Sequence, residues 1–147
     1  MRDKVLELCS GNEEAEKLIF SLWNLFVVWD DAVDGDKKTS QENINSAFMW
    51  ALFGFNESVF YRQNEAAIRP AMFTCIGKWI KANEFEKSGV RTKVIDAYAM
   101  RTSPYELFST IVFLASGSKK QLEAIEYFYT MNPADTLESY LAEHLGE

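Results

Sequence analysis

A run of twelve residues, Leu18 to Trp29, is apolar at ten positions and leads directly into the acidic stretch Asp30 to Asp36. The run is too short to span a membrane, which takes about 20 apolar residues. If it is helical, its apolar side chains cover most of the circumference, as is typical of a helix buried among other helices. The sequence therefore predicts a central buried helix from about Asn12 to Val33.

Capping residues, prolines and glycines mark the ends of further helices. Asn12, or Ser10 together with Glu13, can cap the central helix, and Gly35 can end it. The next expected helix follows a Thr39–Glu42 capping box, runs for about fourteen residues and ends at Gly54. A short helix at Asn56–Ile68 comes next, and then a helix that Pro70 begins or kinks and that Gly89 closes. The remaining expected helices are Val90–Ser116 with a break at Pro104, Ser118–Tyr129, and Pro133–Leu145. No segment alternates between apolar and polar residues as a half-buried strand does. The predicted fold class is all-α, a single-domain bundle of about six or seven helices over residues 1–147.

Apolar spacing indicates which side chains face the core. Ile44, Ala47, Phe48, Ala51 and Leu52 recur at i, i+3 and i+4, and the next long helix carries Met72, Phe73, Ile76, Trp79 and Ile80 on its apolar side. The larger aromatic residues are interpreted as core rather than as a ligand box: Trp23, Phe26, Trp29, Phe48, Trp50 and Trp79.

Composition restricts the classes of partner. The formal net charge is −7, and no cluster of Lys or Arg is long enough to follow a phosphate backbone, so nucleic acid is not an expected partner. Two cysteines, Cys9 and Cys75, do not make a disulfide scaffold and are expected as reduced thiols. No signal peptide or membrane span is recognised, so we expect a cytoplasmic protein without membrane contact. A homo-oligomer is compatible with the sequence, although no heptad seam assigns an interface.

The acidic stretch is the candidate for chemistry. On a helix, Asp30 and Asp34 (i, i+4) and Asp31 and Asp34 (i, i+3) share a face, where their oxygens can hold a hard divalent cation. Acids at a helix C-terminus also oppose the helix dipole and require compensation. A bound Mg²⁺ is one source of positive charge and the following lysines, including Lys38, are another, so metal ligation and a solvated acidic loop both stay open. Asp36 is a further candidate ligand.

The spacing Asp-Asp-x-x-Asp at Asp30, Asp31 and Asp34 resembles the first aspartate-rich motif of class I isoprenoid synthases. In that family the motif lies on an inward-facing helix and holds magnesium ions that bridge to a substrate diphosphate. The resemblance implies a reduced isoprenoid-synthase-like bundle that binds Mg²⁺ and a diphosphate-containing ligand. The chain is roughly half the length that the family implies, and no second Asp-rich motif follows. Its nearest substitute is Asn83 with Glu86, which can face one way on a helix.

A longer pattern runs from Trp29 to Lys37, from Trp79 to Glu86 (Trp-x-x-Ala-Asn-x-x-Glu), through Arg101, and to Tyr105-Glu106-Leu107. It resembles small helical proteins of tailed phages and prophages. This resemblance implies a location in the host cytoplasm and brings no established activity.

Arg101 lies amid apolar residues, close to the helix break at Pro104. As an internal arginine it can pair with the carboxylates or receive a phosphate. Alternatively, its stem packs while its head reaches solvent. His144 is the single histidine, so zinc sites rich in histidine and His-dependent nucleophilic catalysis are not expected.

Two classes of function follow from these observations. One is a Mg²⁺-dependent, diphosphate-binding protein with Asp30, Asp31 and Asp34 on the metal. Its candidate ligand-binding residues are Asp36, Lys38, Asn83, Glu86 and Arg101. The other is a non-enzymatic protein that binds a host or phage protein in assembly or regulation. Both enzymes and non-enzymatic proteins are compatible with the sequence.

Overall fold

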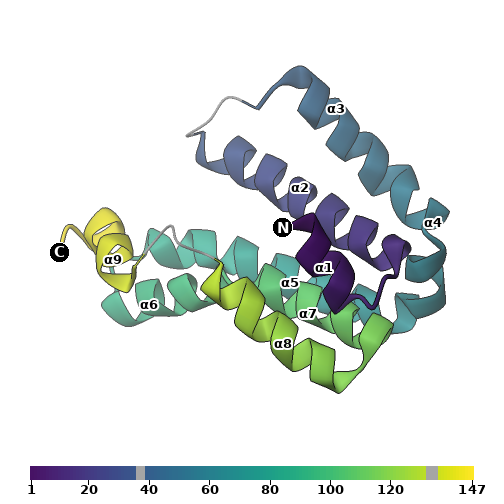
Figure 1. Cartoon of the computed structure of the whole chain (residues 1–147). Coiled ribbons are helices and arrows are strands. Elements are labelled where there is room, and N and C mark those ends of the chain that lie inside the picture. The colour runs from purple at the N-terminus through teal and green to yellow at the C-terminus, as the bar shows by residue number, and fades with distance from the viewer. Residues whose placement is uncertain (36–38, 132–135) are drawn as a thin grey trace.

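The computed structural model describes residues 1–35, 39–131 and 136–147, and all regular secondary structure in these ranges is helical (Figure 1). The helices are α1 (Arg2–Leu8), α2 (Glu13–Asp34), α3 (Gln41–Met49), the π-helix η1 (Trp50–Gly54), α4 (Phe55–Glu57), α5 (Val59–Glu86), α6 (Arg91–Met100), α7 (Ser103–Ser116), α8 (Ser118–Thr130) and α9 (Leu137–Leu145). The all-α bundle predicted from the sequence is confirmed. Within the described ranges, none of the helices has both the length and the apolar character that crossing a membrane requires.

Helix α2 is the central helix that the sequence predicted. The Asn12 side chain caps it by accepting a hydrogen bond from the backbone N–H of Ala15 at 3.1 Å. Gly35 ends it in the left-handed conformation, at φ 69°, which glycine adopts without steric cost. Helices α1, α3, α5 and α7 all contact α2.

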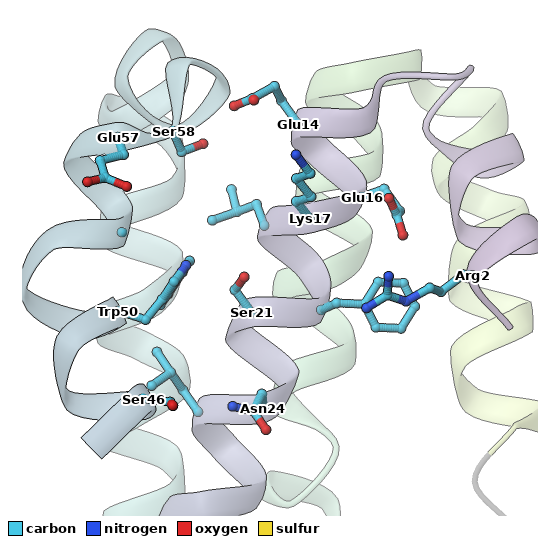
Figure 2. A pocket seen from close by; sticks show the side chains of 14 residues that line it. Arg2, Glu14, Glu16, Lys17, Ser21, Asn24, Ser46, Trp50, Glu57 and Ser58 are labelled. Atoms are coloured by element: carbon cyan, nitrogen blue, oxygen red, sulfur yellow. The ribbon is translucent and has the colours of Figure 1, made fainter. Parts of the chain in front are cut away.

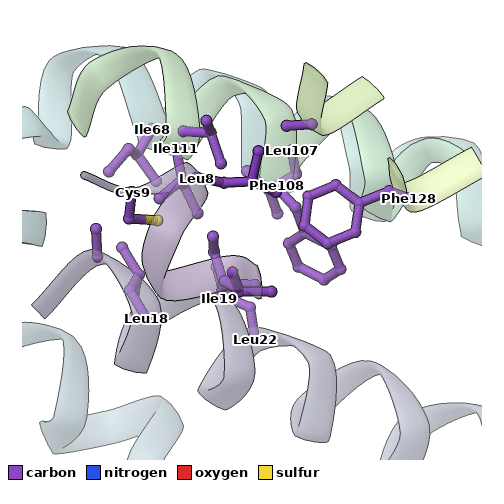
Figure 3. Packing of buried hydrophobic residues seen from close by; sticks show 14 of the residues in the cluster. Leu8, Cys9, Leu18, Ile19, Leu22, Ile68, Leu107, Phe108, Ile111 and Phe128 are labelled. Atoms are coloured by element: carbon purple, nitrogen blue, oxygen red, sulfur yellow. The ribbon is translucent and has the colours of Figure 1, made fainter. Parts of the chain in front are cut away.

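The main core lies where α1, α2, α5, α7 and α8 meet (Figure 3). Its largest fully buried side chains are Phe108, Phe128, Leu8, Leu18, Ile19, Ile68, Leu107 and Ile111. The Trp23 indole stacks on the Phe108 ring at 5.6 Å between centroids. Full burial of one such side chain stabilises the fold by about 2 kcal/mol, so this cluster supplies most of the hydrophobic stability of the bundle.

A smaller core holds α6 and α9 against the C-terminal end of α5. It consists of Ala82, Val94, Ala97, Tyr140 and Leu141. Figure 1 shows α6 and α9 together at one end of the molecule, away from α1.

Helix α5 is longer than the sequence predicted. Ser58, and not Asn56, caps it, since the Ser58 hydroxyl accepts from the backbone N–H of Tyr61 at 3.1 Å. Pro70 lies inside the helix and neither begins nor ends it. Ile68 and Cys75 are buried on either side of Pro70, so packing against α7 outweighs the backbone hydrogen bond that proline removes.

The α3 segment also differs from prediction. Ser40, and not Thr39, caps α3, and the helix passes through Gly54 instead of ending there. Gly54 has helical dihedral angles, φ −61° and ψ −37°. Because Gly54 has no side chain, the Trp50 indole can pack closely against its backbone. A Cβ at this position would lie 2.4 Å from Cδ1 of Trp50.

Several side chains expected in the core are exposed instead. Ile44, Phe48 and Leu52 are 47%, 64% and 52% exposed, while Ala47 is the buried residue of α3. On α5, Phe73 is 65% exposed. The apolar spacing predicted a helix here, but it did not predict which side of α3 is buried. Spacing along one helix cannot show which side has a neighbouring helix.

At the other end of the chain, α9 begins at Leu137. The Thr136 hydroxyl caps it by accepting from the backbone N–H of Ser139 at 3.1 Å. The predicted cap at Asn132 and Pro133 lies outside the described residues.

Candidate functional site

Arg101 joins the end of α6 to the end of α5. Its Nε donates a hydrogen bond to Glu86 Oε1 at 2.8 Å, and its Nη2 donates to Asn83 Oδ1 at 2.6 Å. The ion pair with Glu86 is mostly sheltered, with the Arg101 and Glu86 side chains 18% and 11% exposed. Asn83 and Glu86 thus face the same way on α5, and Arg101 pairs with a carboxylate.

A tryptophan and a tyrosine complete the surroundings of this ion pair. The Arg101 guanidinium lies over the Trp79 ring, 5.1 Å from its centroid, and the Tyr140 hydroxyl hydrogen-bonds to Glu86. Burial disfavours the charged guanidinium, but the hydrogen bond and charge of Glu86 outweigh that effect and raise the pKa of Arg101. Arg101 is therefore a permanent cation whose charge is already compensated.

Asp30 and Asp34 form a carboxyl pair near the C-terminal end of α2. Burial, the charge of Asp34 and a hydrogen bond with Asp34 raise the pKa of Asp30 from 3.8 to about 6, and the positive charge of Arg101 opposes this rise. Two neighbouring carboxylates repel each other, and this repulsion favours the protonated form of Asp30, so Arg101 does not fully offset it.

Asp30, Asp34 and Arg101 line a cavity of about 650 Å³, here called the Asp30 cavity. Its walls come from α2, α5, α6, α7 and α9 and from Thr102 at the joint between α6 and α7. The remaining lining residues are Val27, Trp79, Glu86, Tyr98, Thr102, Tyr105, Tyr140, Glu143 and His144. A smaller hollow of about 130 Å³ shares Val27, Asp30, Trp79, Arg101 and Tyr105 with it and extends toward Trp23, Phe26, Pro104 and Phe108.

The lining of the Asp30 cavity is acidic and aromatic. Because Arg101 is paired with Glu86, the carboxyl groups of Asp30, Asp34 and Glu143 are in excess over positive charge among the described lining residues. Trp79, Tyr98, Tyr105 and Tyr140 contribute aromatic rings. The indole N–H of Trp79 is buried and has no hydrogen-bond acceptor within the described part of the chain.

The predicted site residues are distributed unevenly around this cavity. Asp30, Asp34, Glu86 and Arg101 line it, and Asn83 holds Arg101 in place. Asp31 is not a lining residue, although its charge contributes to the raised pKa of Asp30. Asp36 and Lys38 lie outside the described residues. Among residues 1–35, 39–131 and 136–147, no three His, Cys, Asp or Glu side chains gather as a metal-binding group.

Some lining residues were not predicted from the sequence. Trp79 could have been found, because it shares one side of α5 with Asn83 and Glu86 at i, i+4 and i+7. Tyr140, Glu143 and His144 reach the cavity from α9. Because α9 lies far from α2 and α5 in the sequence, no local pattern indicates that these three residues reach the cavity.

A second hollow, of about 500 Å³, lies mainly between α2 and the α3–η1 segment (Figure 2). Trp50 leans into it from η1, and Ser21 and Asn24 border it from α2. Charged groups of both signs, Glu14 and Lys17 among them, stand near one end, so no single charge type is favoured there. The Asp30 cavity has the more selective chemistry of the two.

No protein-family model, curated protein or solved structure matches this chain.

Proposed function

We propose that this protein is a binding protein that takes a small organic cation, such as an amine, into the Asp30 cavity. The observation that carries the proposal is the Asp30–Asp34 carboxyl pair in a cavity whose arginine is already neutralised by Glu86. An incoming ammonium group would supply the positive charge that Arg101 does not, and so would relieve the repulsion between the two carboxylates.

The aromatic walls support the same ligand class. A cation over the face of Trp or Tyr gains about 0.5–2 kcal/mol, depending on how far it is desolvated. Tyr98, Tyr105 and Tyr140 border the cavity that Asp30 and Asp34 also line. The volume of about 650 Å³ lies within the range of roughly 300–1,000 Å³ that is usual for small-molecule sites.

The test is the shift in thermal unfolding midpoint with putrescine, a linear diamine, and with butane-1,4-diol as its neutral counterpart. Putrescine should raise the midpoint of the wild type, and the diol should not. Asp30→Asn should abolish the shift, while Asp31→Asn, which alters a neighbouring acid outside the cavity lining, should retain it. A wild type that putrescine leaves unchanged, or an Asp30→Asn variant that responds like the wild type, contradicts the proposal.

A second candidate is Mg²⁺ with a diphosphate-containing ligand, which the Asp30–Asp34 pair favours. Mg²⁺ commonly uses one or two protein carboxylates and completes its shell with water and phosphate oxygens, and two adjacent carboxylates fit that requirement. Against it, the compensated charge of Arg101 leaves little attraction for a free anion. Stabilisation by Mg²⁺ plus pyrophosphate that exceeds the shift with either alone, and that Asp34→Asn removes, would favour this candidate over the amine.

A further inference from the structure

The α3–η1 segment presents an uncovered apolar surface that is separate from the Asp30 cavity. Ile44, Phe48, Met49, Leu52 and Phe53 form this surface, here called the α3 face, and each is between 47% and 64% exposed. Ser46 and Trp50 border the hollow beside α2, and Ala47 is buried, so the opposite side of the segment carries the large apolar groups. Figure 1 shows α3 at the edge of the molecule, next to α2.

The size of the α3 face suits a protein interface. Aromatic side chains bury about 150–250 Å² each; taking roughly 200 Å² for each of the five residues, at about half exposure they present about 500 Å². That is near the upper end of the largest apolar patch on a typical monomer, roughly 300–600 Å². A standard interface buries about 800 Å² per partner, and the polar rim of Gln41 and Asn45 can add to the apolar centre.

We propose that a second copy of this chain packs on the α3 face to form a two-fold symmetric dimer. Charge favours the α3 face over most other faces of the chain as the contact between two copies. Two copies of a chain with a net charge of −7 repel each other, but the sequence carries no charged residue between Glu42 and Glu57. The α3 face is thus a large apolar area on which two acidic copies can meet without bringing carboxylates together.

The spacing of the apolar residues is also self-complementary. Ile44 and Leu52 lie at equal distances along the sequence on either side of Phe48. When two antiparallel copies cross at Phe48, Ile44 of one meets Leu52 of the other, and the two Phe48 rings meet at the axis. An isologous interface requires this kind of match between a surface and itself.

The experiment measures molar mass by light scattering over a range from low to high micromolar protein. Wild type should approach twice the mass of the chain as its concentration rises. Phe48→Glu should remain at the mass of one chain, because it places a carboxylate at the two-fold axis. Phe73→Glu is the matched control, since Phe73 is 65% exposed on α5 and Phe48 is 64% exposed on α3; this control should dimerise as the wild type does.

Circular dichroism should give the same helical signal for all three proteins, and Ile44→Gln serves as a milder substitution on the α3 face if Phe48→Glu does not fold. A wild type that stays monomeric throughout overturns the proposal, and so does a dimer that persists in folded Phe48→Glu. Equal loss of dimer in Phe48→Glu and Phe73→Glu also overturns it. The proposal is independent of the Asp30 cavity, so Asp30→Asn should dimerise as the wild type does.

Discussion

Tyr140 and Arg101 both donate hydrogen bonds to the same oxygen of Glu86, Oε1. This shared acceptor ties α9 to the joint between α5 and α6, although Tyr140 lies 54 residues beyond Glu86 in the chain. Because Tyr140, Glu143 and His144 reach the Asp30 cavity from α9, the position of one wall depends on this carboxylate.

Replacing Tyr140 by Phe removes the hydroxyl and retains the ring that packs beside Tyr98. A hydrogen bond to a charged group contributes about 1.5–3 kcal/mol, so Tyr140→Phe should lower the free energy of unfolding by about 2 kcal/mol in urea titration. Tyr129→Phe is the control, because the Tyr129 hydroxyl meets Thr102 at an exposed position. Equal losses in the two variants would show that the Glu86 contact contributes nothing particular.

Replacing Arg101 by Met leaves the Glu86 carboxylate sheltered without its cation. Removing one partner of a buried pair costs about 3–5 kcal/mol, and the partial exposure here reduces the expected loss of unfolding free energy to about 2–3 kcal/mol. Arg101→Met combined with Glu86→Gln should recover part of that loss. Lys78→Met, which breaks the exposed pair with Glu106 at 2.9 Å, should change stability by less than about 1 kcal/mol. A double variant no more stable than Arg101→Met would contradict the ion-pair explanation.

The raised pKa of Asp30 predicts a pH dependence of stability. The folded state holds the Asp30 proton more tightly than the unfolded chain does, with a pKa of about 6 against 3.8. Its stabilising contribution is therefore present below about pH 4 and is lost as the pH rises to about 6. Allowing for solvent screening, the loss should be on the order of 1 kcal/mol, and Asp30→Asn should lack it in urea titrations across this range. Identical pH profiles for wild type and Asp30→Asn would refute this assignment.

Amine binding should show the complementary pH dependence. A protonated Asp30 carries no charge for an ammonium group, so the affinity for putrescine should weaken as the pH falls below about 6. Isothermal titration calorimetry at several pH values measures this effect. Affinity that is constant from neutral pH to about pH 5 would place the bound amine away from Asp30.

Gly54 and Gly77 offer a matched pair of glycine substitutions in helices. Gly54→Ala should destabilise the fold by about 1–3 kcal/mol, because the new methyl group overlaps the Trp50 indole. Gly77→Ala meets no atom within 4 Å and should stabilise α5 by about 0.5–1 kcal/mol. Thermal unfolding distinguishes these opposite signs, and stabilisation by Gly54→Ala would contradict the Trp50 contact.

Local chemistry explains which parts of the fold could be predicted. Asn12 and Gly35 act on neighbouring backbone groups, so the limits of α2 followed from the sequence to within a residue. Pro70 does not begin a new helix, because packing of α5 against α7 outweighs its local cost. The exposed position of Phe48 has a similar cause, since a periodic pattern identifies an apolar side of a helix and says nothing about its neighbour.

The candidate site was predictable where spacing along one helix brings residues together. Asn83 and Glu86 share a side of α5 because of their i, i+3 spacing, and Asp30 with Asp34 follows the i, i+4 rule. The partners of Glu86 come from α6 and α9, so the convergence of Arg101 and Tyr140 needed tertiary structure. Asp36 and Lys38 lie outside the described residues, and their roles stay predictions.

The division of the apolar interior into a large and a small core has a kinetic consequence. Helix α9 is anchored chiefly through the small core, in which Tyr140 and Leu141 are its buried members. Regions with few buried apolar contacts open with a lower free energy than the whole molecule needs to unfold. Backbone amides of α9 should therefore exchange with deuterated solvent before those of α2 or α7. A molecule too large to enter the Asp30 cavity while α9 is docked would then gain access at the rate of this local opening, while the main core stays folded.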